Sequence, residues 1–359
     1  MKIRFLLTSI FLLTASLTYA QDELTVVNFG GSFAKAAEEG FEVDFVAETG
    51  IKINKEDYNG GLAQIRAQVE AGSVFWDAVY TETKDVVIGC DEGLFEYLDE
   101  LELPPAPDGT PAEEDFYPGS NHECGISHLF WATAVAFDTR QFEDKTTPTQ
   151  LEHFFDPETY PGRRGVHRNP VSTLEFALMA DGVHPDKVYE VLGTDEGLMQ
   201  ALSMYDKIKD QIVWWEAGAH PPQLLADGEV SMTTAWNGRI FNAQVLENQP
   251  IEIIWDGHTV DIGYLVVVAG APNLEHALEF VRYSAKTEAI LGIASRIAYS
   301  PTRKSATAML STHIPTGVEM LPHMPYVTER PGRKLVHDAE FWADHLDDIN
   351  ERFSAWLSN

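Results

Sequence analysis

The sequence predicts an α/β protein with more than one hydrophobic core. Strand-like and helix-like segments alternate along the first part of the chain, an order typical of a mostly parallel sheet covered by helices. The chain has 359 residues, of which 44% are hydrophobic, so it can bury sizeable cores. This length favours two domains over one and excludes overall disorder.

Residues 1–20 have the pattern of a secretory signal peptide. Lys2 and Arg4 precede an apolar run that begins at Phe5, and the run ends in small residues up to Ala20. The run is too short for a membrane-spanning helix, and no later segment reaches the roughly 20 apolar residues that a bilayer requires. We therefore expect a chain exported to the periplasm after cleavage near Ala20.

The region after the signal peptide predicts repeated strand and helix units. In chain order, the expected elements are a strand over 24–29, a turn with a helix start at Gly30-Gly31-Ser32, a helix over 33–45, a strand over 51–54, a helix over 62–69 and a strand over 78–80.

A second α/β region is expected from about 129 to 255. Helical periodicity marks residues 173–179, 198–209 and 222–226. The chain closes with an amphipathic helix over 341–356, in which Phe, Trp, Leu and Ile recur at the spacing of a packing face.

The charge balance narrows the classes of partner. With 25 Lys and Arg against 56 Asp and Glu, the formal net charge is −31. Such a chain repels polyphosphates and anionic lipid at long range, so nucleic-acid binding is disfavoured. An acidic surface attracts cationic solutes, but it is also an ordinary means of keeping a protein soluble, so charge alone does not name a ligand.

Cys90 and Cys124 are the two cysteines of the chain. An even count in an oxidising compartment predicts one disulfide. Two separate buried thiols remain the alternative. A metal site is disfavoured because neither cysteine has a CxxC or CxxH neighbour, and no carboxylate pattern frames His122 and His128 as zinc ligands. We expect no metal and no cofactor.

Common catalytic motifs are missing from the sequence. It contains no HExxH, GxSxG, GxGxxG, Walker lysine loop or EF-hand loop. This argues against the common enzymes that carry such motifs. We expect no catalytic residues.

Several segments in fixed order carry a family resemblance. They are Thr49-Gly50-Ile51-Lys52-Ile53, Trp76-Asp77-Ala78-Val79, Trp131-Ala132-Thr133-Ala134, Asp227-Gly228-Glu229-Val230, Ala235-Trp236-Asn237-Gly238-Arg239 and Tyr299-Ser300-Pro301-Thr302. Together they resemble the spermidine/putrescine-type periplasmic solute-binding proteins of ABC transporters, over nearly the whole mature chain.

The resemblance implies a two-lobed α/β periplasmic binding protein fold with a ligand cleft between the lobes. The first lobe would take residues 21–133 and 266–302, and the second would take 134–265 and 303–359 with the C-terminal helices. The protein is expected to be a monomer that closes on a small solute by hinge motion and delivers it to an ABC permease in the inner membrane.

Matching to the family suggests three ligand contacts. Phe29 and Trp236 supply the aromatic faces that an amine needs, and Glu82 supplies a carboxylate for its ammonium group. For Trp236 the alternative is a core position, and for Glu82 it is a solvated loop position.

The sequence departs from polyamine binders at several sites. Arg168 and Asn169 stand where such proteins carry acidic residues, and Arg239 could join Arg168 in holding a carboxylate. Asp261 or Tyr264 could replace a later family contact.

Four further residues are weaker candidates for the ligand site. Gly31 and Ser32 at a helix start suit an anionic group. Adjacent strand residues point to opposite faces, so only one of Trp214 and Trp215 can enter the cleft. We favour Trp215, which lies beside Glu216, as the one that faces the ligand.

The expected ligand is a small amine-bearing solute of polyamine type. The alternative within the same class is a zwitterionic ω-amino acid such as γ-aminobutyrate, or a betaine. A metal complex or a thiamine-like ligand is a further possibility, and an exported hydrolase is the alternative from a different class.

Overall fold

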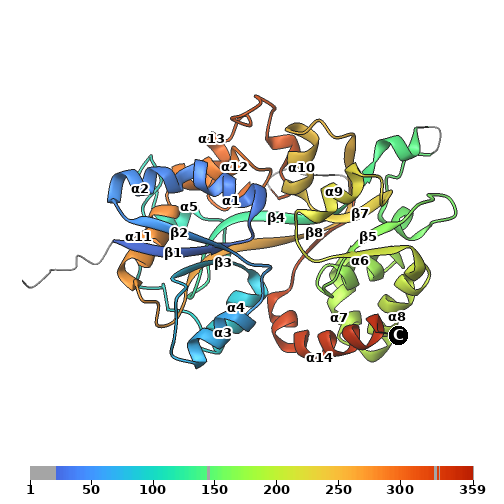
Figure 1. Ribbon diagram of the computed structural model, residues 1–359, viewed down its shortest axis with the longest axis horizontal. Coiled ribbons are helices and arrows are strands. Elements are labelled where there is room, and N and C mark those ends of the chain that lie inside the picture. Colours follow the sequence, from blue (N-terminus) through green and yellow to red (C-terminus); the bar gives the residue numbers. More distant parts are fainter. Residues whose placement is uncertain (1–21, 144–145, 327–329, 331, 359) are drawn as a thin grey trace, which may run out of the picture.

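A computed structural model describes residues 22–143, 146–326, 330 and 332–358 (Figure 1). The predicted signal peptide lies outside the described residues. Within the described part of the chain, no helix has the length and apolar character needed to cross a bilayer.

One twisted sheet runs through the molecule, with strand order β2-β1-β3-β8-β4-β7-β5-β6. In this order the strands are Lys52–Asp57, Glu23–Asn28, Ala78–Glu82, Ile251–Val267, Ile126–Asp138, Met232–Trp236, Arg164–His167 and Ile212–Trp215. Two short strands pair off this path: β9 (Ser300–Pro301) with β4, and β10 (Lys334–Val336) with β8.

The sheet is mixed rather than mostly parallel. Its outer parts are parallel, since β1 pairs with β2 and β3, and β5 pairs with β6 and β7. Its centre is antiparallel, where β8 pairs with β3 and β4 and β4 pairs with β7. The physical reason is that β4 and β8 are long strands that cross the molecule in opposite directions and join its two halves (Figure 1).

Helices cover both halves of the sheet (Figure 1). Around β1, β2 and β3 and in the segments that follow β8, they are α1 (Gly31–Ala37), α2 (Val43–Thr49), α3 (Ala63–Glu70), α4 (Thr83–Asp91), α5 (Ala112–Asp115), α11 (Leu274–Ser284), α12 (Thr287–Ala294) and α13 (Lys304–Met309). In the other half they are α6 (Thr173–Ala180), α7 (Val188–Leu192), α8 (Asp195–Asp206), α9 (His220–Ala226), α10 (Asn237–Val245) and α14 (Ala339–Leu357).

Separate cores define two lobes. In the first lobe, side chains such as Val26, Phe45 and Phe280 pack on one face of the strands, and Val27, Trp76 and Val86 pack on the other. In the second lobe, a large core joins α6 and α8 to the apolar face of α14, and a smaller one surrounds α9 and α10.

The C-terminal region is divided between these cores. Ala306, Leu310 and Met320 pack in the first-lobe core, whereas Trp342, Ile349 and Phe353 of α14 pack in the second. This differs from the expectation that everything after residue 303 follows the second lobe. The reason is that α13 packs against α12 and β9 before the chain crosses over. The other lobe boundaries stay predictions.

Most of the expected elements match the structure closely. The strand predicted over 24–29 is β1, and the helix predicted over 173–179 is α6. The helix start expected at Ser32 falls earlier, because Gly30, with φ 63°, is the residue that precedes α1.

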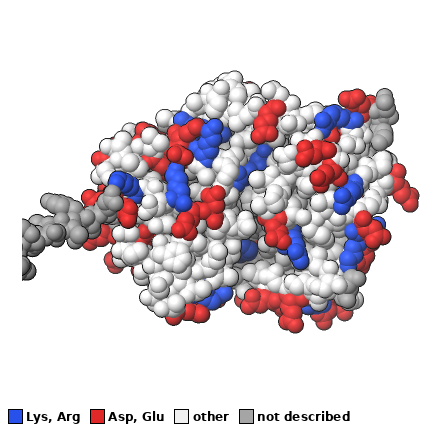
Figure 2. Space-filling model, in the orientation of Figure 1, with Lys and Arg blue, Asp and Glu red and all other residues white. Residues whose placement is uncertain are grey.

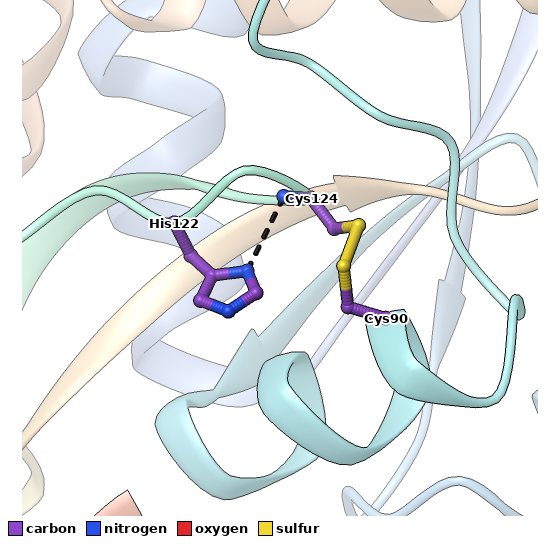
Figure 3. A group of neighbouring side chains, drawn as sticks. All are labelled: Cys90, His122 and Cys124. Carbon is purple, nitrogen blue, oxygen red and sulfur yellow. Dashed lines mark hydrogen bonds between the residues drawn. A yellow bond between two sulfur atoms is a disulfide. The ribbon is translucent and has the colours of Figure 1, made fainter.

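The predicted disulfide between Cys90 and Cys124 is confirmed (Figure 3). It links the end of α4 to the loop before β4, within the first lobe. His122 lies beside it, and its Nδ1 accepts a hydrogen bond from the backbone N–H of Cys124 at 3.3 Å. His122 and the two cysteines are close enough to suggest a metal site, but sulfurs bonded to each other offer no thiolate ligand.

We predict that removing this link destabilises the first lobe. The Cys90→Ala/Cys124→Ala double variant should lose about 2 to 4 kcal/mol of unfolding free energy in urea titrations, because the unfolded chain gains conformational freedom. Thiol titration of the denatured, unreduced protein should find no free thiol. Two reactive thiols per chain would contradict the pairing.

Candidate functional site

A small cavity lies between the lobes, where the carboxyl ends of β1, β3 and β7 approach the middle of β4 and β8. Open α/β sheets bind ligands at such strand ends. About 470 Å³ of space, part of it open to solvent, lies within the cavity. Its lining residues are Phe29, Phe33, Tyr80, Thr81, Glu82, His128, Leu129, Trp131, Trp236, Arg239, Gly263 and Tyr299.

Aromatic rings form most of the cavity wall. Trp236 is the central ring: its centroid lies 5.9 Å from Phe29 and 5.7 Å from Trp131, both in edge-to-face contact. Phe33 and Tyr80 make a second edge-to-face pair at 5.1 Å. These pairs fix the orientation of the rings and present apolar surface to a ligand's carbon chain.

Arg239 brings a buried positive charge to this wall. From the first turn of α10 it reaches across to the first lobe, where Nη1 donates to Ser32 Oγ at 2.9 Å and Nη2 donates to the carbonyls of Phe29 and Gly30 at 3.1 and 2.9 Å. Its Nε has no hydrogen-bond partner among the described residues. Burial lowers the pKa of this guanidinium, and the charges of Tyr299 and Asp57 oppose the shift only in part. No ion pair joins Arg239 to a carboxylate among the described residues.

Gly31 makes this contact between the lobes possible. A Cβ at Gly31 would lie 2.6 Å from Nη1 of Arg239, and the backbone there has φ 58°. Both facts favour glycine at this position. Gly31 and Ser32 therefore face the guanidinium of Arg239 from a groove behind the cavity, whereas we expected them to face an anionic ligand directly.

Glu82 brings a negative charge to the same cavity. Burial raises the pKa of its carboxyl, while the nearby Lys84 ammonium opposes the shift. Oε2 of Glu82 accepts from Lys84 Nζ at 2.8 Å. Glu82 also lines the interlobe cleft that continues outward from the cavity, so it lies at the boundary between the two spaces.

Asp261 lies within β8, outside the cavity. Its carboxylate accepts from Thr83 Oγ1 of the first lobe and pairs with His337 Nδ1 at 3.2 Å on the second-lobe side. Nε2 of His337 is 3.1 Å from Ser172 Oγ. Tyr264 is buried in the first-lobe core. Neither Asp261 nor Tyr264 lines the cavity.

Arg168 and Glu216 are placed at the surface. They pair with each other at 3.2 Å, and their side chains are 55% and 63% exposed. The preceding residue, His167, turns into the cleft instead, because successive residues at a strand end point in opposite directions. Arg168, which we expected to face a ligand, therefore lies outside the cavity lining in this structure.

The neighbouring candidates lie just outside the cavity. Asn169 lines the cleft, and its Oδ1 accepts from the backbone N–H of Val171. Trp215 is buried behind His167, with the two rings stacked 4.1 Å apart. Trp214 points the other way and packs against Phe353 and Trp356 of α14.

Several lining residues were absent from our prediction. Trp131 and Tyr299 stand in segments that carried the family resemblance, so the signal was present in the sequence. Phe33, Tyr80 and His128 come from ordinary apolar segments that carry no such signal. Burial lowers the pKa of His128 to about 4, so this ring is neutral in the cavity wall.

The fold and the site together define a two-lobed binding protein with a cavity between the lobes. A family model described as bacterial extracellular solute-binding protein matches residues 42–325, and the chain belongs to this family. It is thus the substrate-binding protein of an ABC transporter, a class without catalytic activity, found outside the cytoplasmic membrane.

Two relatives show where the chain stands within the family. It is 39% identical over 345 residues to the gamma-aminobutyric acid-binding protein of Pseudomonas aeruginosa, covering 96% of this chain and 94% of the relative. It is 23% identical over 288 residues to the spermidine/putrescine-binding periplasmic protein of Escherichia coli, covering 79% of each. The expected resemblance is confirmed for the family, but the more similar of these two relatives binds an amino acid.

Solved structures confirm the periplasmic binding protein fold. The binding protein MotA of A. tumefaciens B6 in complex with glucopine has a TM-score of 0.83 and 26% identity, covering 93% of this chain and 99% of MotA. The Atu4243-GABA receptor has a TM-score of 0.78 and 26% identity, covering 93% and 97%.

We predict that the buried pair of His337 and Asp261 makes a pH-dependent contribution to the free energy of unfolding. Burial opposes protonation of His337, but the hydrogen bond and charge of Asp261 outweigh it and raise the pKa above 6.5. The same partner holds the pKa of Asp261 below 3.8, against the opposing effect of burial. The stabilisation is therefore complete below about pH 6.5 and is lost as pH rises through the raised pKa of His337; at the acid end it is lost as pH falls through the lowered pKa of Asp261.

The test compares His337→Gln with the wild type. The variant should lose roughly 3 to 5 kcal/mol at pH 6, because one partner of a buried pair is removed, and the difference should shrink as pH rises above about 6.5. Denaturant titrations across pH measure it, and His184→Gln, at an exposed histidine, is the control. Parallel curves for wild type and His337→Gln would show that His337 does not titrate in this range.

Proposed function

We propose that this protein captures a small zwitterionic ω-amino acid, of which γ-aminobutyrate is the type, and delivers it to an ABC permease. The observation that carries the proposal is the charge arrangement of the cavity. A buried guanidinium without a carboxylate partner and a buried carboxylate line one small aromatic space.

Each end of such a ligand has a matching group. Its carboxylate would pair with Arg239, whose Nε is free among the described residues; a charge-assisted bond there would offset the cost of burying the guanidinium. Its ammonium would pair with Glu82 and face the ring of Trp236. Its methylene chain would contact Phe29 and Trp131.

The relatives support the same ligand class. The relative at 39% identity is a gamma-aminobutyric acid-binding protein, and one solved structure of similar fold is a GABA receptor. A polyamine, which the sequence first suggested, fits the site less well. Each ammonium beyond the first would enter a space that already holds Arg239 and, just outside the cavity, Lys84.

Calorimetry tests the ligand class directly. At one pH and ionic strength, γ-aminobutyrate should bind at least about tenfold more tightly than putrescine or spermidine, a difference of about 1.4 kcal/mol. 4-Aminobutanamide, which lacks the carboxylate, should also bind weakly. Tighter binding of spermidine would contradict the proposal.

Two arginine variants separate the site from the surface. Arg239→Met should weaken γ-aminobutyrate at least about tenfold and 4-aminobutanamide much less, because the lost pair involves the carboxylate. Arg168→Ala should leave both affinities unchanged, since this exposed side chain pairs only with Glu216 among the described residues. An equal loss for both ligands on Arg239→Met would assign Arg239 to lobe closure alone.

We further predict that Trp236→Ala weakens γ-aminobutyrate by about 1 kcal/mol or more, because both ring burial and the cation–π contact are lost. The matched control is Trp214→Ala, which removes a tryptophan that packs on α14 outside the cavity. It should lower stability and leave affinity unchanged. Lowered stability with unchanged affinity for Trp236→Ala would make that residue part of the core.

A further inference from the structure

A buried lysine lies next to the proposed ligand site. Lys84 belongs to the first turn of α4, and its side chain is 8% exposed. Its Nζ lies 2.8 Å from Glu82 Oε2 and 3.1 Å from Asp85 Oδ1, so one ammonium bridges two carboxylates. Burial opposes this charge, but Asp85 and Glu82 outweigh it and raise the pKa of Lys84. The ammonium is therefore charged at any physiological pH.

Glu82 shows where Lys84 lies relative to the cavity. Glu82 lines both the cavity and the interlobe cleft, whereas Lys84 and Asp85 line only the cleft. Outside the cavity, the Glu82 carboxylate thus contacts the Lys84 ammonium, which in turn contacts the Asp85 carboxylate.

The other titratable groups near Lys84 are neutral, paired or exposed to solvent. Glu92 of the same cleft pairs with Arg66 at 2.8 Å, and Asp347 is exposed on α14. His167 approaches from the second lobe, and burial together with the Lys84 charge lowers its pKa to about 4, so its ring is neutral. Asp261 is engaged by His337 and Thr83. The second oxygen of Asp85 accepts from the backbone N–H of Gly61 and from Thr81 Oγ1.

We propose that Lys84 occupies the place that a second ammonium group of a ligand would take, and that it thereby restricts the protein to ligands with a single amine. The inference rests on the proposed function for the ligand's first amine, which pairs with Glu82.

A diamine carries a second ammonium group, which must also find a place near the cavity. An α,ω-diamine whose first ammonium contacts Glu82 must place its second ammonium toward Arg239 or toward the cleft. Arg239 repels it, and in the cleft the nearest carboxylates already hold Lys84. Burying a second cation there costs both desolvation and like-charge repulsion. A ligand with one amine and one carboxylate meets neither cost.

Lys84→Met tests this idea by removing the internal ammonium and leaving Glu82 and Asp85 without their partner. By calorimetry, putrescine should bind the variant at least tenfold more tightly than it binds the wild type, and it should raise the melting temperature more in the variant. Lys84→Arg, which keeps the charge, should gain nothing for putrescine. Arg168→Ala removes a positive charge at the surface and is the matched control, with no gain expected.

The outcomes separate this inference from the proposed function. If Lys84→Met folds, as shown by an unchanged circular dichroism spectrum, and putrescine binds no better, the inference is overturned. If Lys84→Met does not fold, Lys84→Gln, which keeps hydrogen bonds without the charge, is judged by the same criterion. If the wild type does not bind γ-aminobutyrate, the proposed function fails, while a gain for putrescine in the variant would still support the role of Lys84.

Discussion

One buried guanidinium, that of Arg239, makes three hydrogen bonds between the lobes. Arg239 leaves α10 of the second lobe and binds three acceptors at the start of the first. This geometry requires a glycine at position 31, because a side chain there would meet the guanidinium. It also desolvates a positive charge whose partners in the described chain are neutral, which is costly unless a negative group joins it. The same residue therefore links the lobes and, in the proposed function, would pair with the carboxylate of the ligand.

The aromatic wall sets how strongly those charges act. Trp236 contacts Phe29 from the first lobe and Trp131 from β4, so rings from both lobes and a crossing strand enclose the space. Apolar rings exclude water and lower the local dielectric, so a charge pair inside gains more than it would at the surface. The exposed pair of Arg168 and Glu216 shows the contrast: it has a similar separation to the contacts inside, but solvent and salt screen it.

The sequence predicted the helices and strands better than it predicted which of their side chains face the cavity. Apolar periodicity located β1 and α6, and the family motifs indicated Phe29, Glu82, Trp236 and Arg239, which all line the cavity. Arg168 was expected to face the ligand but lies at the surface. Periodicity locates a strand end without deciding whether His167 or Arg168 turns inward. Lys84 was missed because a lysine in the first turn of a helix is ordinarily solvated. α14 of the second lobe packs against α4, a contact distant in sequence that no local pattern reports.

The acidity of the chain does not by itself choose a cation as ligand. Acidic side chains spread over the visible face and gather along its lower edge, in the region where α14 lies in the ribbon view (Figures 1 and 2). The Debye length at physiological salt is about 8 Å, so most of that surface charge is screened from the cavity. The local balance matters instead. The two carboxylates Glu82 and Asp85 equal in number the two cations Lys84 and Arg239, although only Lys84 forms ion pairs with them, and Asp261 pairs with His337. A zwitterion keeps this region neutral when it enters, whereas every additional ammonium of a polyamine would leave one buried positive charge unmatched.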